Sequence, residues 1–415
     1  MRTLLVPFGL AALLLSPSWS AVAHAQTPTA FPETLSLEQA LALAAERSPE
    51  LAAASRELEA QEGSVQQAGA LPNPSFNALM EDTQRATRTL TGTLDIPIEL
   101  GGKRAARVSA AEQARALAQA RLGDARSRLR AAVIAAWFQV LVAQERLQLA
   151  DDSATLAARG ADAVKRRVEA GKVSPVDGTR ARVEAANVAL ERVEAQAQVH
   201  LARHALAALW GDATPRFRVV SGDIGAVPAR GAAEDLLRAL EQAPALRMAQ
   251  IEATRRKALI EVEKGRGVPD LTLNLGVKRD NELGRNQAVI GFSMPLPVFD
   301  RNQGAVYEAS KRADQAADEV LSARMRLAAE LQQASTQLAV AQASLQALRD
   351  TVLPAAQEAE ASASKGFEAG KFGFLDVVDA RRALFQARAR YLATLSTAYQ
   401  AAAAIDRVLG SPEHE

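Results

Sequence analysis

Two segments in which apolar and polar residues alternate constrain this fold more than any other feature of the sequence. In residues 269–297 one apolar run alternates with polar residues and glycine, a polar turn passes through Gly284, and a second alternating run follows. Residues 74–98 repeat the pattern, more weakly in the first of their two runs. Because successive side chains of a strand point to opposite faces, each segment predicts a β-hairpin with one apolar and one polar face.

The length of these strands is informative. Strands of about ten residues with one apolar face are typical of membrane-spanning barrels, which present that face to lipid. Four strands cannot close a barrel alone, since the smallest familiar ones have about eight and open sheet edges are not tolerated in lipid. Several copies of the chain would have to share one barrel. The pattern alone leaves a soluble two-hairpin sheet equally open.

The N-terminus favours the membrane alternative. Arg2 precedes the apolar run from Leu4 to Leu15, and Ala23-His24-Ala25 follows, so residues 1–25 are predicted to be a secretory signal peptide. The rest of the sequence contains no run of about twenty apolar residues, so no membrane-spanning helix is predicted. The chain has no cysteine, so no lipid-modified N-terminal cysteine is expected, and its net charge of +1 does not point to nucleic acid. Export and amphipathic strands together predict an outer-membrane location.

Long helices are predicted outside the hairpins. Ser36 is the expected cap of a first helix, and a second is expected from Pro49 to about Gly69. No proline occurs between Pro97 and Pro175, and the segment 105–170 has the composition of a long helix. About 65 helical residues would span roughly 100 Å. Within this segment the sequence Asp151-Asp152-Ser153 predicts a helix restart, hence two stacked helices. A turn at Gly171 and a returning helix over 176–209 follow.

The second half of the sequence repeats the first at a shift of 195 to 200 residues. The residue pairs that match are Pro49 with Pro244, Pro74 with Pro269, Pro97 with Pro297, Gly171 with Gly370, and Asp177 with Asp376. This register predicts an internal duplication. The first repeat is 26–211 and the second is 233–410, with a linker over 212–232 and a tail over 411–415. The second long helices are expected at about 305–369 and 374–409, with a break at Pro354 level with the one at Asp151-Asp152-Ser153.

These features resemble the TolC-type outer-membrane efflux proteins over essentially the whole mature chain. Three motifs are similar to the heavy-metal, cobalt-zinc-cadmium (CzcC-like) subgroup: Leu71-Pro72-Asn73-Pro74, Ile98-Glu99-Leu100-Gly101-Gly102-Lys103-Arg104, and Leu296-Pro297-Val298-Phe299-Asp300-Arg301-Asn302-Gln303-Gly304. The resemblance implies a mainly α chain whose homotrimer shares a twelve-stranded β-barrel in outer-membrane lipid, continued by a twelve-helix periplasmic tunnel.

The same resemblance implies partners and a substrate class. A channel of this kind docks to a periplasmic adaptor and to an inner-membrane, proton-driven pump of the RND type. The subgroup implies export of divalent cations such as cobalt, zinc or cadmium. A drug or organic-solute channel of the same fold is an alternative. A periplasmic coiled-coil adaptor is a rival from another class, although adaptors present one helical hairpin and not two repeats.

Candidate site residues lie around the two helix turns. Asp376 and Asp379, three apart at a helix start, match the family's pore-lining aspartates, and threefold symmetry would place six carboxylates at the narrowest point. Asp177 is the equivalent in the first repeat. All three could instead cap helices, which is the reading favoured for Asp177. Phe367 and Phe372 stand where the best-known family member has a latching tyrosine and arginine, so an apolar constriction is expected.

Four further residues and two histidines complete the candidates. The turns at Gly171, Lys172, Gly370 and Lys371 are the expected surface for adaptor docking. His200 and His204 are spaced four apart on a helix but have no third ligand nearby, so no metal site is expected. No phosphate-binding loop and no pairing of a nucleophile with a base is present. We expect neither a cofactor nor enzymatic activity.

Overall fold

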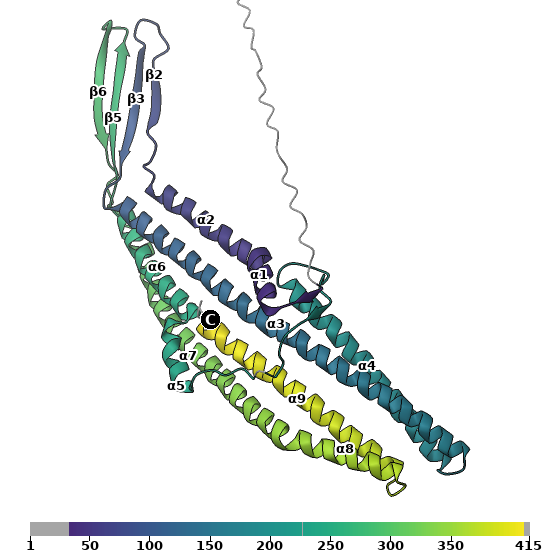
Figure 1. Cartoon of the computed structure of the whole chain (residues 1–415). Helices are drawn as coiled ribbons and strands as arrows, with labels where there is room; N and C mark the ends of the chain where they lie inside the picture. Colours follow the sequence, from purple (N-terminus) through teal and green to yellow (C-terminus); the bar gives the residue numbers. More distant parts are fainter. Residues whose placement is uncertain (1–32, 226, 411–415) are drawn as a thin grey trace, which may run out of the picture.

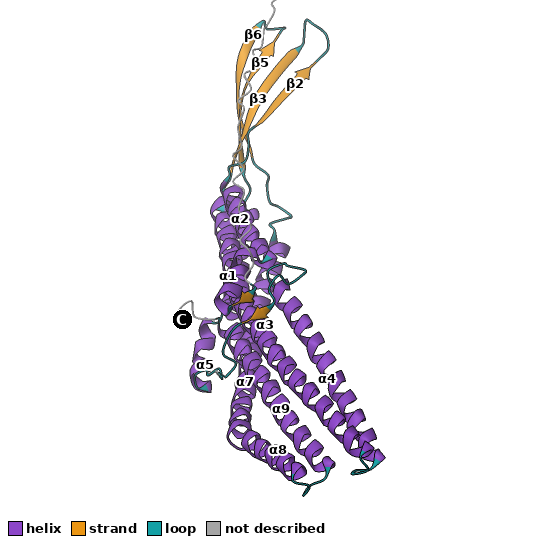
Figure 2. Ribbon diagram, turned by 45° about the vertical axis from the view of Figure 1, so that its right-hand side comes forward, coloured by secondary structure: helices purple, strands orange, loops and turns teal. Residues whose placement is uncertain are grey.

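We analysed a computed structural model that describes residues 33–225 and 227–410. The predicted signal peptide 1–25 and the tail 411–415 lie outside the described residues. The molecule is elongated, with a four-stranded sheet at one end and a bundle of long helices extending away from it (Figure 1). Two helical hairpins form the end that is remote from the sheet (Figure 2).

Both predicted hairpins are present, and they lie side by side in one sheet. The strands are β2 (Ser75–Glu81), β3 (Thr89–Ile98), β5 (Leu271–Asp280) and β6 (Arg285–Ser293), in the spatial order β2-β3-β5-β6. All three pairings are antiparallel. The register pairs Phe76 with Leu94, Leu94 with Leu275, and Leu275 with Ile290. Since directly paired residues share a face, the apolar residues of all four strands form one continuous surface.

That apolar surface is bare in the single chain. Phe76, Ile290 and Phe292 are 72%, 77% and 80% exposed. The strand β6 ends at Ser293, four residues before the predicted limit at Pro297. Pro295 and Pro297 lack the backbone N–H that a ladder requires, so the chain leaves the sheet before reaching them.

The helices of the two halves occur in the same order. In the first half α1 (Leu37–Arg47) and α2 (Pro49–Gly69) precede the strands, and α3 (Lys103–Glu169) and α4 (Pro175–Ala208) follow them. In the second half α5 (Ala233–Ala239) and α6 (Pro244–Arg266) precede the strands, and α7 (Gln303–Ala347), α8 (Leu353–Glu368) and α9 (Phe374–Leu409) follow. Ser36 caps α1 as predicted, by accepting the Gln39 N–H in a reciprocal capping box.

The prediction of a helix restart at Asp151-Asp152-Ser153 was wrong. The helix α3 runs for 67 residues without a break, because each of these residues keeps the N–H that continues the helix. Their side chains serve other partners: Asp151 pairs with Arg192 of α4 at 3.5 Å, and Asp152 accepts the Gln148 amide at 3.1 Å. The second half does have an interruption, a π-helical turn over Leu348–Val352 immediately before Pro354.

The segment 212–232, predicted as a linker, has structure of its own. Its strand β4 (Val219–Val220) pairs in parallel with β1 (Thr34–Leu35), and the indole N–H of Trp137 donates to the Leu35 carbonyl at 3.4 Å. Sequence reasoning missed this small sheet because two-residue strands carry no periodicity. It closes a core around Trp137 of α3.

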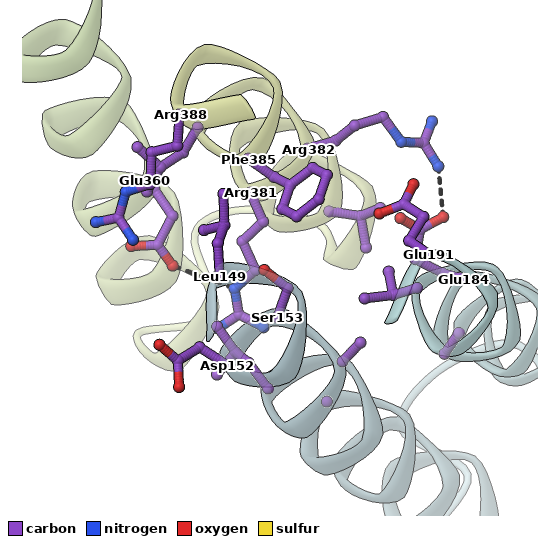
Figure 3. A pocket seen from close by; sticks show the side chains of 17 residues that line it. Leu149, Asp152, Ser153, Glu184, Glu191, Glu360, Arg381, Arg382, Phe385 and Arg388 are labelled. Atoms are coloured by element: carbon purple, nitrogen blue, oxygen red, sulfur yellow. Dashed lines mark hydrogen bonds and ion pairs between the residues drawn. The ribbon is translucent and has the colours of Figure 1, made fainter. Parts of the chain in front are cut away.

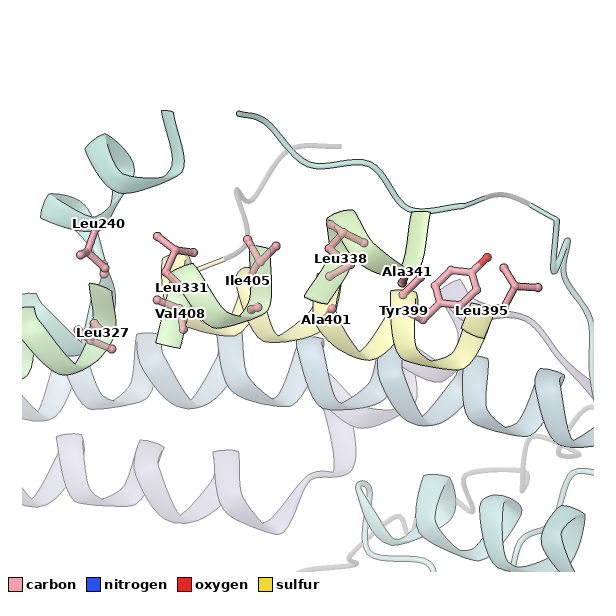
Figure 4. Packing of buried hydrophobic residues seen from close by; sticks show 14 of the residues in the cluster. Leu240, Leu327, Leu331, Leu338, Ala341, Leu395, Tyr399, Ala401, Ile405 and Val408 are labelled. Carbon is pink, nitrogen blue, oxygen red and sulfur yellow. The ribbon is translucent and has the colours of Figure 1, made fainter. Parts of the chain in front are cut away.

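A second core joins α7 and α9 beside α6. Leu331, Leu395 and Ile405 are among its fully buried side chains, and small residues such as Ala401 let the helices approach closely (Figure 4). Among the described helices, none has the length and apolar character needed to cross a membrane.

Candidate functional site

The two helix turns have the same backbone geometry. Gly171 ends α3 and Gly370 ends α8, with φ of +68° and +71°, a left-handed conformation that glycine adopts without a steric penalty. Each turn is closed by the N–H of the following lysine: Lys172 donates to the Arg167 carbonyl and Lys371 to the Gly366 carbonyl, both at 2.8 Å. Gly171, Lys172, Gly370 and Lys371 are all exposed. The turns that contain them, between α3 and α4 and between α8 and α9, form the ends of the two helical hairpins (Figure 1).

Asp376 and Asp379 lie on the exposed surface at the start of α9. The Asp376 carboxylate accepts the Gly373 N–H at 2.8 Å, so this residue caps its own helix. Asp379 follows three residues later on the same face and is also exposed. The capping bond uses one oxygen of one carboxylate, and both negative charges remain open to solvent.

Asp177 has a different environment in the other turn. The side chain of Ser174 supplies the cap there, by accepting the Val176 N–H at 3.2 Å. Asp177 is half-buried and lies 4.0 Å from Arg180 of the same helix. Its charge is therefore opposed by a neighbouring cation, unlike the charges of Asp376 and Asp379.

An aromatic contact joins the two tips. The Arg167 guanidinium lies over the Phe367 ring, 4.2 Å from the ring centroid, within the range of a cation–π interaction. Phe372 folds back onto α8 and covers Gly366, where an added Cβ would lie 2.1 Å from the ring. Sequence reasoning identified both phenylalanines but missed Arg167, because residues 200 apart in the chain carry no local signal of contact.

Further from the tips, a cavity of about 320 Å³ separates the two helical hairpins. Arg382 of α9 pairs with Glu184 of α4 across it, and Arg381 binds Glu360 of α8 at 3.1 Å (Figure 3). Burial raises the pKa of Glu191, and the neighbouring charge of Glu184 adds to the effect. The Arg382–Glu184 pair thus joins the two hairpins across a partly apolar space, and the Arg381–Glu360 pair joins α8 to α9 within the second hairpin.

The two described histidines lie near the end of α4. His200 and His204 are both exposed on α4, and the Nδ1 atom of His204 lies 3.1 Å from the Ala213 carbonyl oxygen. Across residues 33–225 and 227–410, no three side chains of histidine, cysteine, aspartate or glutamate are grouped so as to hold a metal.

Sequence comparison identifies related proteins. The profile of the family described as "Outer membrane efflux protein" matches residues 40–212 and 236–411. The chain is 53% identical over 418 residues to the cobalt-zinc-cadmium resistance protein CzcC of Cupriavidus metallidurans, covering 99% of this chain and 100% of the relative.

Solved structures show the same fold. A membrane protein from Pseudomonas aeruginosa superimposes with a TM-score of 0.78 at 20% identity, covering 90% of each chain. CusC, whose crystal structures concern folding and transmembrane channel formation, gives 0.75 at 17% identity, covering 91% of this chain and 92% of its own.

Proposed function

The chain belongs to the outer membrane efflux protein family, and on this premise we propose that it is the passive outer-membrane conduit for divalent heavy-metal cations such as cobalt, zinc or cadmium. An outer-membrane location and a role as an efflux channel, not an enzyme, follow from the family itself. The metal substrate rests on one observation, the 53% identity to a cobalt-zinc-cadmium resistance protein over the full chain. We also propose that the chain acts with a periplasmic adaptor and a proton-driven RND pump.

The open edges of the sheet support a trimer. The strands β2 and β6 each pair on one side only, and their free N–H and C=O groups would be unsatisfied in lipid. Joining β6 of one copy to β2 of the next removes every free edge. Three copies give a barrel of about twelve strands, with the bare apolar face outside and the polar face around a water-filled lumen.

The helical part also lacks a partner along one surface. Val176, Val183 and Leu190 of α4 are spaced seven residues apart and are each more than half exposed. Seven-residue spacing places them in one stripe, the pattern of a seam between packed helices. A neighbouring copy that covers this stripe would extend the barrel into a helical tunnel built from the paired halves.

The tip of this tunnel is the proposed aperture. Asp376 and Asp379 are exposed and carry no opposing cation within ion-pair distance among the described residues. Three copies would place six carboxylates around the opening and favour cations. Phe367 and Phe372 would narrow it, and the turns at Gly171, Lys172, Gly370 and Lys371 would meet the adaptor.

The proposed substrate class can be tested by measuring how well a strain that lacks this gene tolerates metals and organic compounds. We expect lower tolerance to zinc, cobalt or cadmium, restored by the gene on a plasmid, and unchanged tolerance to dyes and antibiotics. Sensitivity to organic compounds alone would keep the channel and contradict the metal assignment. A protein that needs no detergent for extraction and runs as a monomer would contradict the channel itself.

A further inference from the structure

The polar face of the sheet carries five charged residues. Four of them are two acids and two bases that stand in pairs, so their charges cancel. Glu81 pairs with Lys278 at 3.4 Å, and Asp280 stands directly opposite Arg285 in the register. These four lie towards the hairpin loops. The fifth, Asp95, lies three residues before the end of β3, on the side of the helices. The face therefore carries three acids and two bases, or one net negative charge per chain.

Asp95 is held by neutral partners. One carboxylate oxygen accepts the side-chain amide of Asn274 on β5 at 2.7 Å, and the other accepts the amide of Asn77 on β2. Asn274 is its direct register partner, and Ser75 faces it from β2. These amides fix the position of the carboxylate without cancelling its charge, and no cation lies within ion-pair distance of it among the described residues.

Two ion pairs lie at the junction below this level. Glu99 is bound by Arg107, and Asp270 pairs with Lys103 at 2.7 Å. Asp95 thus lies between two levels of ion pairs and has no cationic partner of its own among the described residues.

We propose that Asp95 is a specificity-determining residue of the channel, which gives the base of the barrel a preference for cations over anions. This inference rests on the proposed trimeric barrel, in which three copies would form a ring of three carboxylates. A fixed charge acts over about one Debye length, roughly 8 Å at physiological salt. The ring would therefore enrich divalent cations along the wall after they have passed the aperture.

A thiol-reaction assay can measure this local potential, because the chain has no cysteine of its own. Thr93→Cys places one thiol on the polar face, two residues from Asp95, or about 7 Å along the strand. The trimer would be reconstituted in liposomes, and reaction rates measured with a trimethylammonium and a sulfonate methanethiosulfonate reagent. The ratio of the two rates reports the local cation preference.

Adding Asp95→Asn should lower this ratio by about threefold or more in about 0.1 M salt, since a surface potential of the order of kT changes local ion concentrations by such factors. The change should shrink in 1 M salt. Thr89→Cys is the matched control, since it lies on the same face about 20 Å away, and its ratio should not respond to Asp95→Asn.

A swap separates charge from structure. In Asp95→Asn combined with Asn274→Asp, the carboxylate moves to the facing strand and the amide–carboxylate pair is retained, so the ratio should return towards its original value. An unchanged ratio in Asp95→Asn would overturn the proposal and leave the channel intact. A Thr93→Cys thiol that reacts with neither reagent would show that this face meets no water, and the proposed barrel would fall with it.

Discussion

The turn between α3 and α4 and the turn between α8 and α9 share a backbone but differ in charge. At the shift of 199 residues, Asp177 corresponds to Asp376 and Arg180 to Asp379. The first turn carries an acid beside a base 4.0 Å away, and the second carries two exposed acids. The two turns therefore share a backbone but differ in charge at these positions: the pair in the first turn is balanced, and the pair in the second turn is negative.

The long helices differ in the same way. The helix α3 is continuous, whereas the second half has a π-helical turn before Pro354, in which the Leu353 N–H reaches the Leu348 carbonyl. The extra residue in the turn accommodates a proline that cannot donate. Below it α8 bends towards α9 (Figure 2). The second half therefore combines the bend, the exposed acids and the two tip phenylalanines.

The largest effect is expected from a proline placed in the unbroken helix. Ala154 lies 200 residues before Pro354. Ala154→Pro should destabilise the protein by about 3 kcal/mol or more, because it removes one hydrogen bond and no π-helical turn makes room for the ring. The reverse change, Pro354→Ala, should alter stability by less than about 1 kcal/mol. The heat-dissociation temperature of the proposed trimer on gels measures both effects. Equal losses would show that the two halves tolerate proline alike.

The next effect concerns the charge at the proposed aperture. Asp379→Arg gives the second turn the charge pattern of the first, and changes the charge by two units per chain, or six in the proposed trimer. The reversal potential of the reconstituted pore in a salt gradient should lose most of its cation preference. Asp177→Asn is the control and should have little effect, because Arg180 already opposes that charge. Unchanged selectivity in Asp379→Arg would exclude this position from the aperture.

A smaller effect is expected at the junction between sheet and helices. Glu99, which follows β3, binds Arg107 through both carboxylate oxygens, and this hydrogen bonding holds the pKa of Glu99 below its usual value. A lowered pKa means that the unfolded state binds more protons, so the pair stabilises the fold above about pH 4.5 and the contribution is lost as the pH falls further.

Glu99→Gln should therefore remove about 1 kcal/mol at pH 7 and flatten the acid limb of the stability profile. The second half offers the contrast. At the positions 200 residues further on, the exposed residues Phe299 and Tyr307 replace the acid and the base. The dissociation temperature, measured between pH 3 and 7, tests whether the Glu99–Arg107 pair makes this contribution to stability. An acid limb identical to that of the unmodified protein would contradict the role of this pair.

The smallest effect is expected for the contact between the tips. Arg167→Gln removes the cation from the Phe367 ring and should cost about 0.5 to 1 kcal/mol. Arg166→Gln, one residue away, is the matched control. A double-mutant cycle with Phe367→Leu should show coupling for Arg167 and none for Arg166. Additive effects at Arg167 would mean that the contact does not hold the tips together.

Local sequence patterns were sufficient for the elements themselves. The bounds of α2 at Pro49 and Gly69, the cap at Ser36 and the turns at Gly171 and Gly370 all follow from residues within a few positions of each other. One local failure, the restart at Asp151-Asp152-Ser153, came from residues that favour helix starts but do not prevent a helix from continuing. Only a residue without an N–H, as at Pro354, forces an interruption.

By itself, then, the sequence determined the alternating strands, the long helices and the two turns, because these depend on short-range periodicity and backbone chemistry. The tertiary structure alone decided that β3 lies beside β5, that Asp95 meets Asn274 across 179 residues, and that Arg167 covers Phe367. Such contacts depend on how whole faces pack and on the register of one strand against another. The alternating pattern places Asp95 on the polar face, but a shift of two residues between β3 and β5 would keep that face and put Thr272 or Gly276 opposite Asp95 in place of Asn274.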